Sequence, residues 1–152
     1  MSGIRAVFEK GPVTYSASVN IRGGQLVEPD EFTARIKPTA GATTACLGVA
    51  MVDAAGVSHS VADTQDPWGN TVVTATLVPN EVAVAWQGVW RLKNAATGVG
   101  SGAIGFGDRV VTAANGEIMP YIAQDLDLIV GTCVEPGGIA PGAEGKVILG
   151  LG

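Results

Sequence analysis

Short stretches of this chain alternate between apolar and polar residues, which is the period of a β-strand that buries one face. The clearest stretch covers residues 13–21, with Val13, Tyr15, Val19 and Ile21 on one face and Thr14, Ser16, Ser18 and Asn20 on the other. Similar runs predict strands over residues 45–52, 72–78, 81–86, 89–92, 108–112 and 126–134. A helical period is nearly absent, and residues 30–37 have room for a short helix at most. We therefore expect many short strands and little helix.

Asn115 and Gly116 give the strongest hairpin signal in the sequence. A type I′ turn needs a positive φ at both central residues, and the pair Asn-Gly adopts this conformation at little cost. Apolar residues flank the pair at Val110, Val111 and Ile118. The sequence therefore predicts a hairpin whose turn lies at these two residues.

The strand pattern occurs twice, with an offset of 83 residues between Gly24 and Gly107 and between Gly48 and Gly131. The first copy contains G-Q-L-V, I-K-P and L-G-V-A-M-V-D, the second contains G-D-R-V, I-M-P and V-G-T-C-V-E-P, and alternating runs follow at residues 82–86 and 146–149. A unit that cannot bury its apolar face alone packs against its copy. We predict an all-β fold, a compact β-barrel or sandwich with long Gly-rich loops, built from degenerate repeats at about residues 24–88 and 107–150 that are related by a pseudo-two-fold. Gly48 and Gly131 are expected at equivalent sites where a side chain would collide with a crossing strand.

A single β domain over residues 13–152, preceded by an N-terminal arm over residues 1–12, is the organisation expected for a chain of 152 residues. Residues 53–70 are rich in turn formers and form an insertion in the first copy. Residues 93–107 are Gly-rich, which predicts a flexible linker or a loop that becomes ordered only against a partner. The strand at residues 13–21 has no evident counterpart before the second copy. We expect it to form an unmatched sheet edge, and such edges are protected or pair with another chain.

Charge limits the classes of partner. The chain has 9 Lys and Arg against 14 Asp and Glu, a formal net charge of −5, and no basic run. Because nucleic-acid affinity depends on clustered cations, we expect no nucleic-acid partner. No apolar run approaches the roughly 20 residues of a membrane-spanning helix, so we expect no membrane partner and synthesis in the cytoplasm. Cys46 and Cys133 lie in apolar runs and are expected to be buried, free thiols.

The sequence offers little catalytic chemistry. Residues 100–105 spell the G-x-G-x-x-G of a dinucleotide site, but the element predicted after them is a strand and not a helix, so we expect no pyrophosphate site. His59 is the only histidine and lies in the turn-rich insertion, where we expect a solvated side chain. The other candidates are carboxylates, interpreted as solvated loop and edge acids: Glu28, Asp30, Glu31, Asp63, Asp66, Asp125 and Asp127. We predict no enzyme activity, no catalytic or metal-binding residues, and no cofactor.

The aromatic residues divide into core and interface candidates. Trp86 shares its parity with Val82 and Val84, which predicts a core position for its side chain. Trp68 lies in a turn outside the periodic strands, where an aromatic side chain is either an interface anchor or a cover for its own core. The predicted interface residues are Ile4, Val7, Phe8, Trp68 and Phe106.

The order of these motifs resembles that of the small capsid decoration, or cement, proteins of tailed bacteriophages. The motifs that carry the resemblance are G-Q-L-V at residues 24–27, L-G-V-A-M-V-D at 47–53, V-A-V-A-W-Q-G-V-W-R-L-K at 82–93, F-G-D-R-V-V at 106–111, N-G-E-I at 115–118, I-V-G-T-C-V-E at 129–135 and G-K-V-I-L at 145–149. They cover nearly the whole chain. The longer insertion at residues 53–70 and the longer N-terminal lead depart from the family pattern.

The resemblance implies a non-enzymatic structural protein that binds the outer surface of an icosahedral phage head, clamps neighbouring major capsid subunits and forms homotrimers. It also implies a location in the virion after assembly in the host cytoplasm. Two other classes stay open: a small non-catalytic β-barrel that binds a sugar or peptide through Trp68 and the insertion, and another virion component such as a tail or head-completion subunit. A monomer in solution would favour the binding module, and attachment to shells would favour a virion protein.

Overall fold

A computed structural model of the chain describes residues 12–56, 63–65, 68, 71–73, 79–122 and 126–150. Its strands are β1 (Val13–Ser16), β2 (Leu26–Pro29), β3 (Ile36–Pro38), β4 (Gly48–Ala50), β5 (Asp63–Gln65), β6 (Thr71–Val73), β7 (Glu81–Ala85), β8 (Gln87–Lys93), β9 (Arg109–Thr112), β10 (Ile118–Pro120), β11 (Ile129–Cys133) and β12 (Glu144–Gly150). Among the described residues, helical structure is limited to two 3-10 turns, Ala114–Gly116 and Leu126–Leu128. The predicted all-β class is confirmed.

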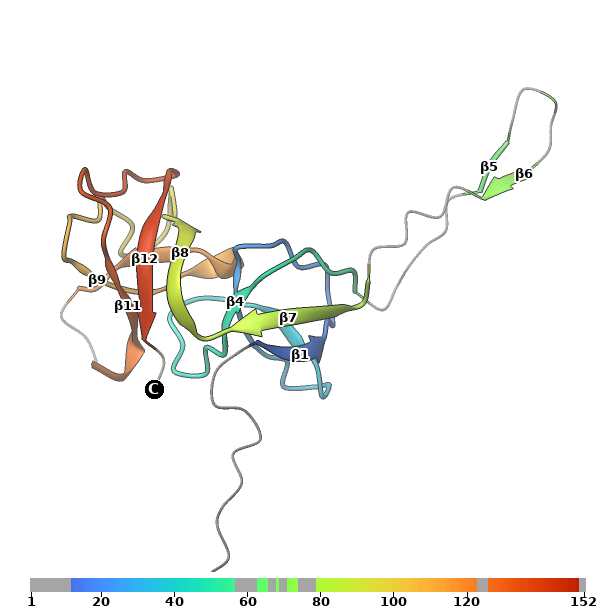
Figure 1. Cartoon of the computed structure of the whole chain (residues 1–152), viewed down its shortest axis with the longest axis horizontal. Helices are drawn as coiled ribbons and strands as arrows, with labels where there is room; N and C mark the ends of the chain where they lie inside the picture. Colours follow the sequence, from blue (N-terminus) through green and yellow to red (C-terminus); the bar gives the residue numbers. More distant parts are fainter. Residues whose placement is uncertain are drawn as a thin grey trace, which may run out of the picture.

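Two five-stranded antiparallel sheets share one strand order. The first sheet has the order β1-β7-β4-β2-β3, and the second, read in the matching direction, has the order β8-β12-β11-β9-β10. Each strand of the first sheet therefore has a counterpart in the second: β1 with β8, β2 with β9, β3 with β10, β4 with β11, and β7 with β12. The predicted match of strand order and direction between the two copies is confirmed, and Figure 1 shows the sheets as two halves of one body.

The two sheets also keep the same residue register. Each of four residue pairs in the first sheet has an equivalent in the second: Val27–Gly48 corresponds to Val110–Gly131, Val27–Pro38 to Val110–Pro120, Ala50–Val84 to Cys133–Val147, and Val13–Val84 to Trp90–Val147. Isolated bridges outside the strands are duplicated as well, Ala17–Ile36 with Asn94–Ile118 and Ile21–Ala54 with Ile104–Ile139. Because the register is the same in every equivalent strand pair, the sequence repeat corresponds to a structural repeat and is not a chance similarity of sequence.

Gly48 and Gly131 occupy equivalent sites, as predicted. A Cβ atom at Gly48 would overlap the carbonyl oxygen of Ala85 on β7, and one at Gly131 would overlap the carbonyl oxygen of Ile148 on β12. Because the obstacle is backbone in both cases, it cannot rotate away as a side chain could. The close approach of the two central strand pairs therefore requires glycine in each half.

The expectation that the first strand lacks a counterpart is wrong. β8 has in the second sheet the edge position that β1 has in the first, and it pairs with β12 as β1 pairs with β7. Only Trp86 separates β7 from β8, so in the sequence β8 looks like the end of the first copy. The second set of strands therefore begins at β8, before the Gly-rich loop.

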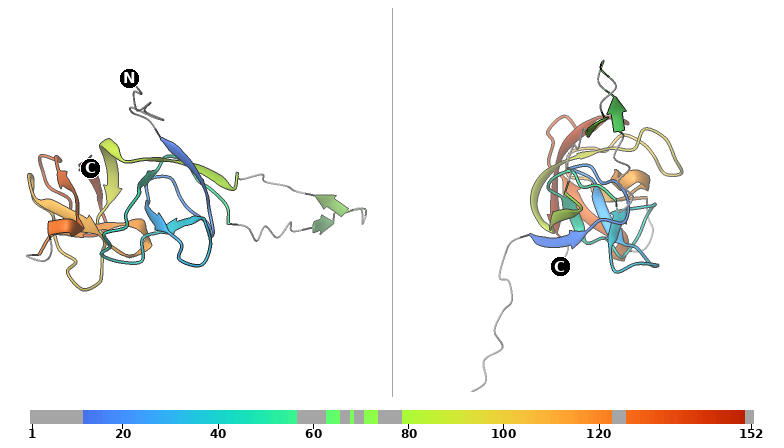
Figure 2. Two further views of the ribbon diagram at one scale, coloured as in Figure 1. Left: turned by 90° about the horizontal axis from the view of Figure 1, so that it is seen from below. Right: turned by 90° about the vertical axis from the view of Figure 1, so that its right-hand side faces the viewer.

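The β5–β6 hairpin is the largest difference between the halves. It lies between β4 and β7, in residues 51–80, whereas the equivalent connection between β11 and β12 spans residues 134–143. At its base, the Ala55 N–H donates to the Pro79 carbonyl oxygen (2.9 Å) and Asn80 Nδ2 donates to the Ala55 carbonyl oxygen (2.9 Å). Figures 1 and 2 show β5 and β6 (green) apart from the two sheets, beyond the N-terminal end of β7.

A shared core holds the halves together. One cluster of buried residues, which includes Val27 and Val82, belongs to the first half alone. A second cluster combines Leu26, Val49 and Ala85 of the first half with Leu92, Ile104, Val110, Ile118, Val130, Cys133, Ile139, Val147 and Leu149 of the second. Because burying apolar surface is the main driving force of folding, the packing of this mixed cluster contributes most to holding the two sheets together.

Buried threonines add polar contacts across the same junction. Thr112 Oγ1 donates to the Gly41 carbonyl oxygen (2.8 Å) and accepts from the Thr43 N–H (2.9 Å), and Thr39 Oγ1 donates to the Ala113 carbonyl oxygen (2.7 Å). Both threonine side chains lie in residues that are at most 1% exposed. The halves are therefore fixed to one another by hydrogen bonds as well as by packing.

The predicted Asn115-Gly116 turn is confirmed. Both residues have a positive φ, 59° and 69°, and the Glu117 N–H donates to the Ala114 carbonyl oxygen (3.3 Å) across the turn. A Cβ atom at Gly116 would lie 2.7 Å from the Leu26 carbonyl oxygen of the other half. The turn thus closes the β9–β10 hairpin and packs on the first sheet.

Two local expectations are wrong. The strand expected over residues 13–21 ends at Ser16, and Val19 is 47% exposed, because the chain leaves the sheet edge to form the bridges at Ala17 and Ile21. No helix forms over residues 30–37. The Asp30 carboxylate accepts a hydrogen bond from Thr33 Oγ1 (3.1 Å), which favours a turn at this point, and β3 begins at Ile36.

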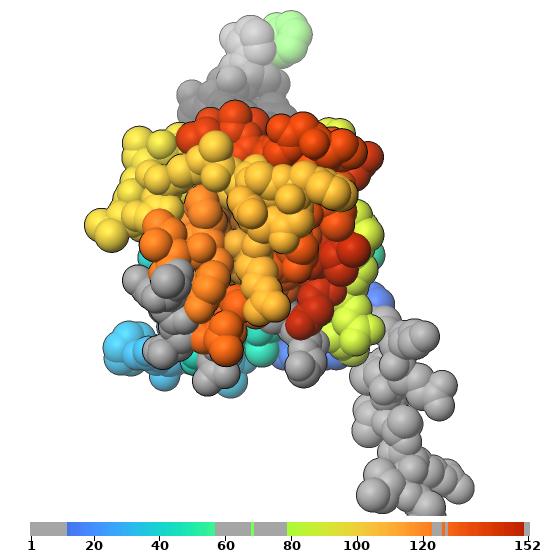
Figure 3. Space-filling view, turned by 90° about the vertical axis from the view of Figure 1, so that its left-hand side faces the viewer, coloured from blue at the N-terminus to red at the C-terminus, as the bar shows by residue number. Residues whose placement is uncertain are grey.

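The Gly-rich segment over residues 93–107 is neither a linker nor dependent on a partner for its order. Ile104 is 1% exposed in the shared core, and Asn94 Nδ2 donates to the carbonyl oxygens of Gly102 (2.8 Å) and Ile139 (2.9 Å). Figure 3 shows the segment (yellow to gold) lying over the second half. The glycine-rich spelling at residues 100–105 is followed by a turn and β9, as predicted, and not by the helix that a dinucleotide site needs.

Candidate functional site

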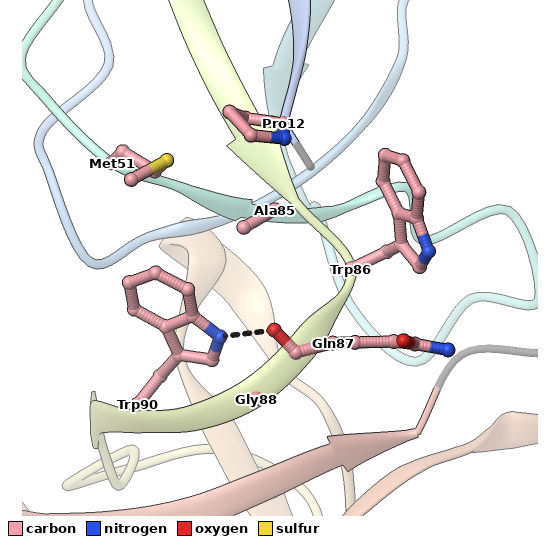
Figure 4. A pocket seen from close by; sticks show the side chains of 7 residues that line it. All are labelled: Pro12, Met51, Ala85, Trp86, Gln87, Gly88 and Trp90. Atoms are coloured by element: carbon pink, nitrogen blue, oxygen red, sulfur yellow. Dashed lines mark hydrogen bonds between the residues drawn. The ribbon is translucent and has the colours of Figure 1, made fainter. Parts of the chain in front are cut away.

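An apolar cleft of about 430 Å³ lies where the chain passes from the first sheet to the second (Figure 4). Its walls come from Pro12 before β1, Met51 after β4, Ala85 at the end of β7, and Trp86, Gln87, Gly88 and Trp90 around the start of β8. Three segments that are distant in the sequence therefore meet at one surface. The duplicated fold brings them together, because both edge strands, β1 and β8, begin here.

Local contacts fix the Trp90 wall. Its Nε1 donates to the Gln87 carbonyl oxygen (3.1 Å), as the dashed line in Figure 4 shows, and its ring packs against the shared core. A Cβ atom at Gly88 would lie 3.3 Å from Trp90 Nε1. A larger residue at position 88 would therefore press on the indole and narrow the cleft.

Trp86 lines this cleft, and its predicted core position is wrong. Val82 and Val84 are buried as expected, each 1% exposed, but β7 ends at Ala85, so the alternation that points these valines inward stops before Trp86. The indole is half-buried at the surface. In Figure 4 it stands on the opposite side of the cleft from the indole of Trp90.

The lining of the cleft suits binding and not acid–base chemistry. None of its seven lining residues is ionisable, and two are tryptophans. Clefts of roughly 300–1,000 Å³ with apolar, aromatic walls are the usual form of small-ligand and side-chain pockets. The cleft is therefore fitted to an apolar or aromatic group, with the Gln87 amide as a polar group at its edge.

A second, polar cleft of about 260 Å³ lies between the halves on another part of the surface. Three cations (Arg22, Arg91 and Lys93) and two acids (Glu117 and Glu144) are among its lining residues. Lys93 Nζ and Glu117 Oε1 form an ion pair at 2.8 Å. Exposed charges of both signs are typical of a solvated surface, and this cleft carries no specific ligand chemistry.

Two of the predicted interface residues are described, and both are exposed. Trp68, which follows β5, is 83% exposed, and Phe106, in the turn before β9, is 65% exposed. Neither lines the apolar cleft. Ile4, Val7 and Phe8 lie outside the described residues. The structure thus adds an apolar cleft that the sequence analysis did not predict, and neither of these two residues lies in it.

Glu28 is not the solvated acid that the sequence predicted. It is only 9% exposed, its carboxylate accepts a hydrogen bond from the Ala40 N–H (3.2 Å), and Lys37 Nζ lies at 3.8 Å. Asp30 and Glu31 are at the surface, and a hydrogen bond from the Ser18 side chain, followed by one from the Phe32 N–H, lowers the pKa of Asp30. These contacts give Glu28 and Asp30 a structural role in the β2–β3 hairpin.

The other titratable candidates are largely outside the described part of the chain. His59, Asp66 and Asp125 are not among the described residues. For Asp63, in β5, and Asp127, in a 3-10 turn, only the backbone is described. Among the described residues, no three His, Cys, Asp or Glu side chains come together as a metal site would require. No helix in the same residues is long and apolar enough to span a membrane.

Both cysteines are free thiols, as predicted. Cys133 is fully buried in the shared core, and Cys46 is half-buried against it. Burial raises the pKa of Cys46 to about 11. A thiol of this kind is a weak nucleophile at neutral pH, because the thiolate is the reactive form.

Sequence reasoning missed the cleft, although one signal for it was present. Trp86 and Trp90 flank Gly88, so two aromatic side chains border a residue that has none. Pro12 and Met51 carry no such signal, because only the sheet order brings them to the same place.

Comparisons with known proteins support the fold. No protein-family model matches the sequence, and the search of curated proteins finds no match. The structure is similar to the crystal structure of the head fiber gp8.5 N base of bacteriophage phi29, with a TM-score of 0.57 and 17% sequence identity over 91% of this chain and 92% of that chain. The two chains share a fold over nearly their whole lengths.

Proposed function

We propose that this chain is a structural virion protein that binds the outer surface of an icosahedral phage head and stabilises contacts between major capsid subunits, as capsid decoration proteins do. In this proposal it acts without catalysis, metal or cofactor. Its partners are the major capsid protein and further copies of itself in a homotrimer. Its location is the outer surface of the virion.

The observation that carries the proposal is the likeness to the base of a phage head fiber over 91% of the chain. A shared fold alone does not fix function. The proposal therefore also rests on the ordered motifs that resemble decoration proteins, which likewise cover nearly the whole chain.

The surface of the described residues supports a role in contact. Large apolar side chains that are more than half exposed include Phe32, Trp68, Val99 and Phe106, at 90%, 83%, 99% and 65%. Contiguous patches of such exposed side chains mark interaction sites, and these four residues are our candidates for contact. The apolar cleft adds a concave surface of the same character.

The test is attachment to heads. Purified full chain is mixed with undecorated heads of the phage that encodes it, the heads are sedimented, and the pellet is imaged by cryo-electron microscopy. We expect the chain at regular positions on the outer shell and a higher temperature of head rupture. A folded chain that stays in the supernatant at every concentration would contradict the proposal.

A second candidate is the base of a head fiber, because the structural neighbour has that role. A fiber base must attach to the shell and hold an appendage, but it need not strengthen the shell. The two roles are separated by the rupture temperature of heads at saturating chain. Attachment that leaves this temperature unchanged favours the fiber base.

A further inference from the structure

One chain carries both a protruding aromatic side chain and an apolar cleft. Trp68, between β5 and β6, is 83% exposed, and the cleft of about 430 Å³ is walled by Trp86 and Trp90. We propose that Trp68 of one copy inserts into the Trp86–Trp90 cleft of a second copy. This inference deepens the self-association in the proposed function and rests on that part of it.

The hairpin that carries Trp68 is not needed by the fold. Hydrogen bonds between Ala55 and Pro79 and between Asn80 and Ala55 close its base, and the second half reaches the same topology without such an excursion. An aromatic residue on an excursion that the core does not use is positioned for contact with another molecule. Tryptophan is also the residue type most enriched at the energetic centres of interfaces.

The cleft fits an indole in size and chemistry. Its lining contains no ionisable group that would have to lose hydration when an apolar side chain enters. Trp86 and Trp90 offer ring faces and edges for aromatic contacts, and the hydrogen bond from Trp90 Nε1 to Gln87 holds one wall in place before binding. A wall fixed in advance lowers the entropy cost of association.

The positions of the two features favour a second copy as the occupant. The cleft lies at the C-terminal end of β7, and Figures 1 and 2 show the hairpin beyond its N-terminal end. β7 alone separates the two by about 17 Å, given a rise of about 3.4 Å per residue. A contact between different surfaces of two identical chains is head-to-tail, and repeated head-to-tail contacts close into a ring when the rotation permits.

The size of the contact predicts a ring and not an isolated pair. A tryptophan buries about 150–250 Å², whereas stable interfaces bury about 1,200–2,000 Å² in total. A single insertion is therefore weak. In a closed ring every chain gives one Trp68 and receives another, so that the contacts reinforce one another by avidity.

The test uses the full chain and three variants. Trp68→Ala removes the protruding side chain, Met51→Lys puts a charge at a cleft wall whose residue is already 43% exposed, and Phe32→Ala is the matched control at an aromatic residue that is 90% exposed elsewhere. Sedimentation velocity over a concentration series is expected to show assembly of the full chain and of Phe32→Ala. We expect the other two variants to need at least about tenfold more protein to assemble.

Mixing the two defective variants makes the test specific. Met51→Lys retains Trp68 and Trp68→Ala retains the cleft, so labelled Trp68→Ala is expected to bind unlabelled Met51→Lys in fluorescence anisotropy, with neither variant binding itself. The 1:1 pair is expected to be weak, because its single insertion lacks the avidity of the ring, so the titration extends to the highest soluble concentration of Met51→Lys. A monomeric full chain, normal assembly of Trp68→Ala, or an anisotropy in the mixture of folded variants no higher than with each variant alone would overturn the inference. If Trp68→Ala assembles normally and attaches to heads, the inference is wrong and the proposed function stands. If the full chain assembles through Trp68 but does not attach to heads, the inference stands and the proposed function is wrong.

Discussion

Replacing Gly131 or Gly48 by alanine tests the close approach of the central strands, which is the structural basis of the repeat. In each case the added Cβ would overlap a backbone carbonyl oxygen of the neighbouring strand, that of Ile148 or of Ala85. Only separation of the two strands can relieve this contact. The perturbation therefore acts on the pairing of β11 with β12, or of β4 with β7.

The two sites differ in backbone conformation, so their costs should differ. Overpacking in a tight interior costs about 1–3 kcal/mol, which is the expected loss of stability for Gly131→Ala. Gly48 has in addition a φ of 141°, in a region that side-chain-bearing residues rarely adopt. Such strain costs roughly 1–3 kcal/mol more, so Gly48→Ala should be the more damaging change, with a total of about 2–6 kcal/mol.

Thermal unfolding followed by circular dichroism measures these losses. For a chain of this size, about 1 kcal/mol lowers Tm by roughly 2–4 °C. Gly41→Ala and Gly137→Ala are the matched controls, because a Cβ atom there would meet nothing within 4 Å and neither residue has a positive φ. If Gly48→Ala and Gly131→Ala unfold at the same temperature as these controls, the strands are not in close contact and the register equivalence is wrong.

Four further outcomes are expected. Thr112→Val leaves the partly buried Thr43 N–H and Gly41 carbonyl unpaired and should cost about 1–3 kcal/mol in a denaturant titration, whereas Thr14→Val, at an exposed position on β1, should cost little. Burial raises the pKa of Cys46 from 9.0 to about 11. Alkylation of Cys46 in the folded chain, followed as a rate at each pH, should therefore accelerate towards pH 11. The stability that the protonated thiol contributes should be intact below pH 9 and be lost as the pH rises through about 11, which melting curves at each pH would show. Deleting residues 1–10 should leave a folded core with weaker attachment in the head sedimentation assay, and equal attachment would reduce the arm to a terminus without a role. His59→Ala should leave attachment unchanged, and lost attachment would place this residue at the contact.

The repeat could be predicted from the sequence because its signal is local. Gly48 and Gly131 keep the same offset as the valines that face them, and the Asn115-Gly116 pair specifies its turn without reference to the rest of the chain. Alternation of apolar residues likewise predicted the buried Val82 and Val84. Each of these features depends on neighbours in sequence or on backbone conformation, which a single sequence records.

Features that depend on the sheet order could not be predicted. β8 follows β7 after one residue, so the apolar alternation in the sequence continues through the point where the chain passes from the first sheet to the second. The prediction that Trp86 lies in the core because it alternates with Val82 and Val84 therefore failed. Glycines at residues 93–107 indicated a loop but not that Ile104 would enter the shared core. The apolar cleft needs Pro12 and Met51 to meet Trp90, and no local rule specifies contacts between such distant residues.

The differences between the two halves mark the segments that the shared topology does not require. Since both halves reach the same topology and register, the fold requires only what they share. The two largest departures are the β5–β6 excursion in the first half and residues 94–108 in the second, and they occur in non-equivalent connections. Three of the five most exposed large apolar side chains, Trp68, Val99 and Phe106, lie in these segments, whereas Phe32 and Leu126 lie in connections that both halves share. Exposed apolar groups gain nothing from the core, so the three in the unshared segments are the additions to the scaffold that we expect to make contact with other molecules.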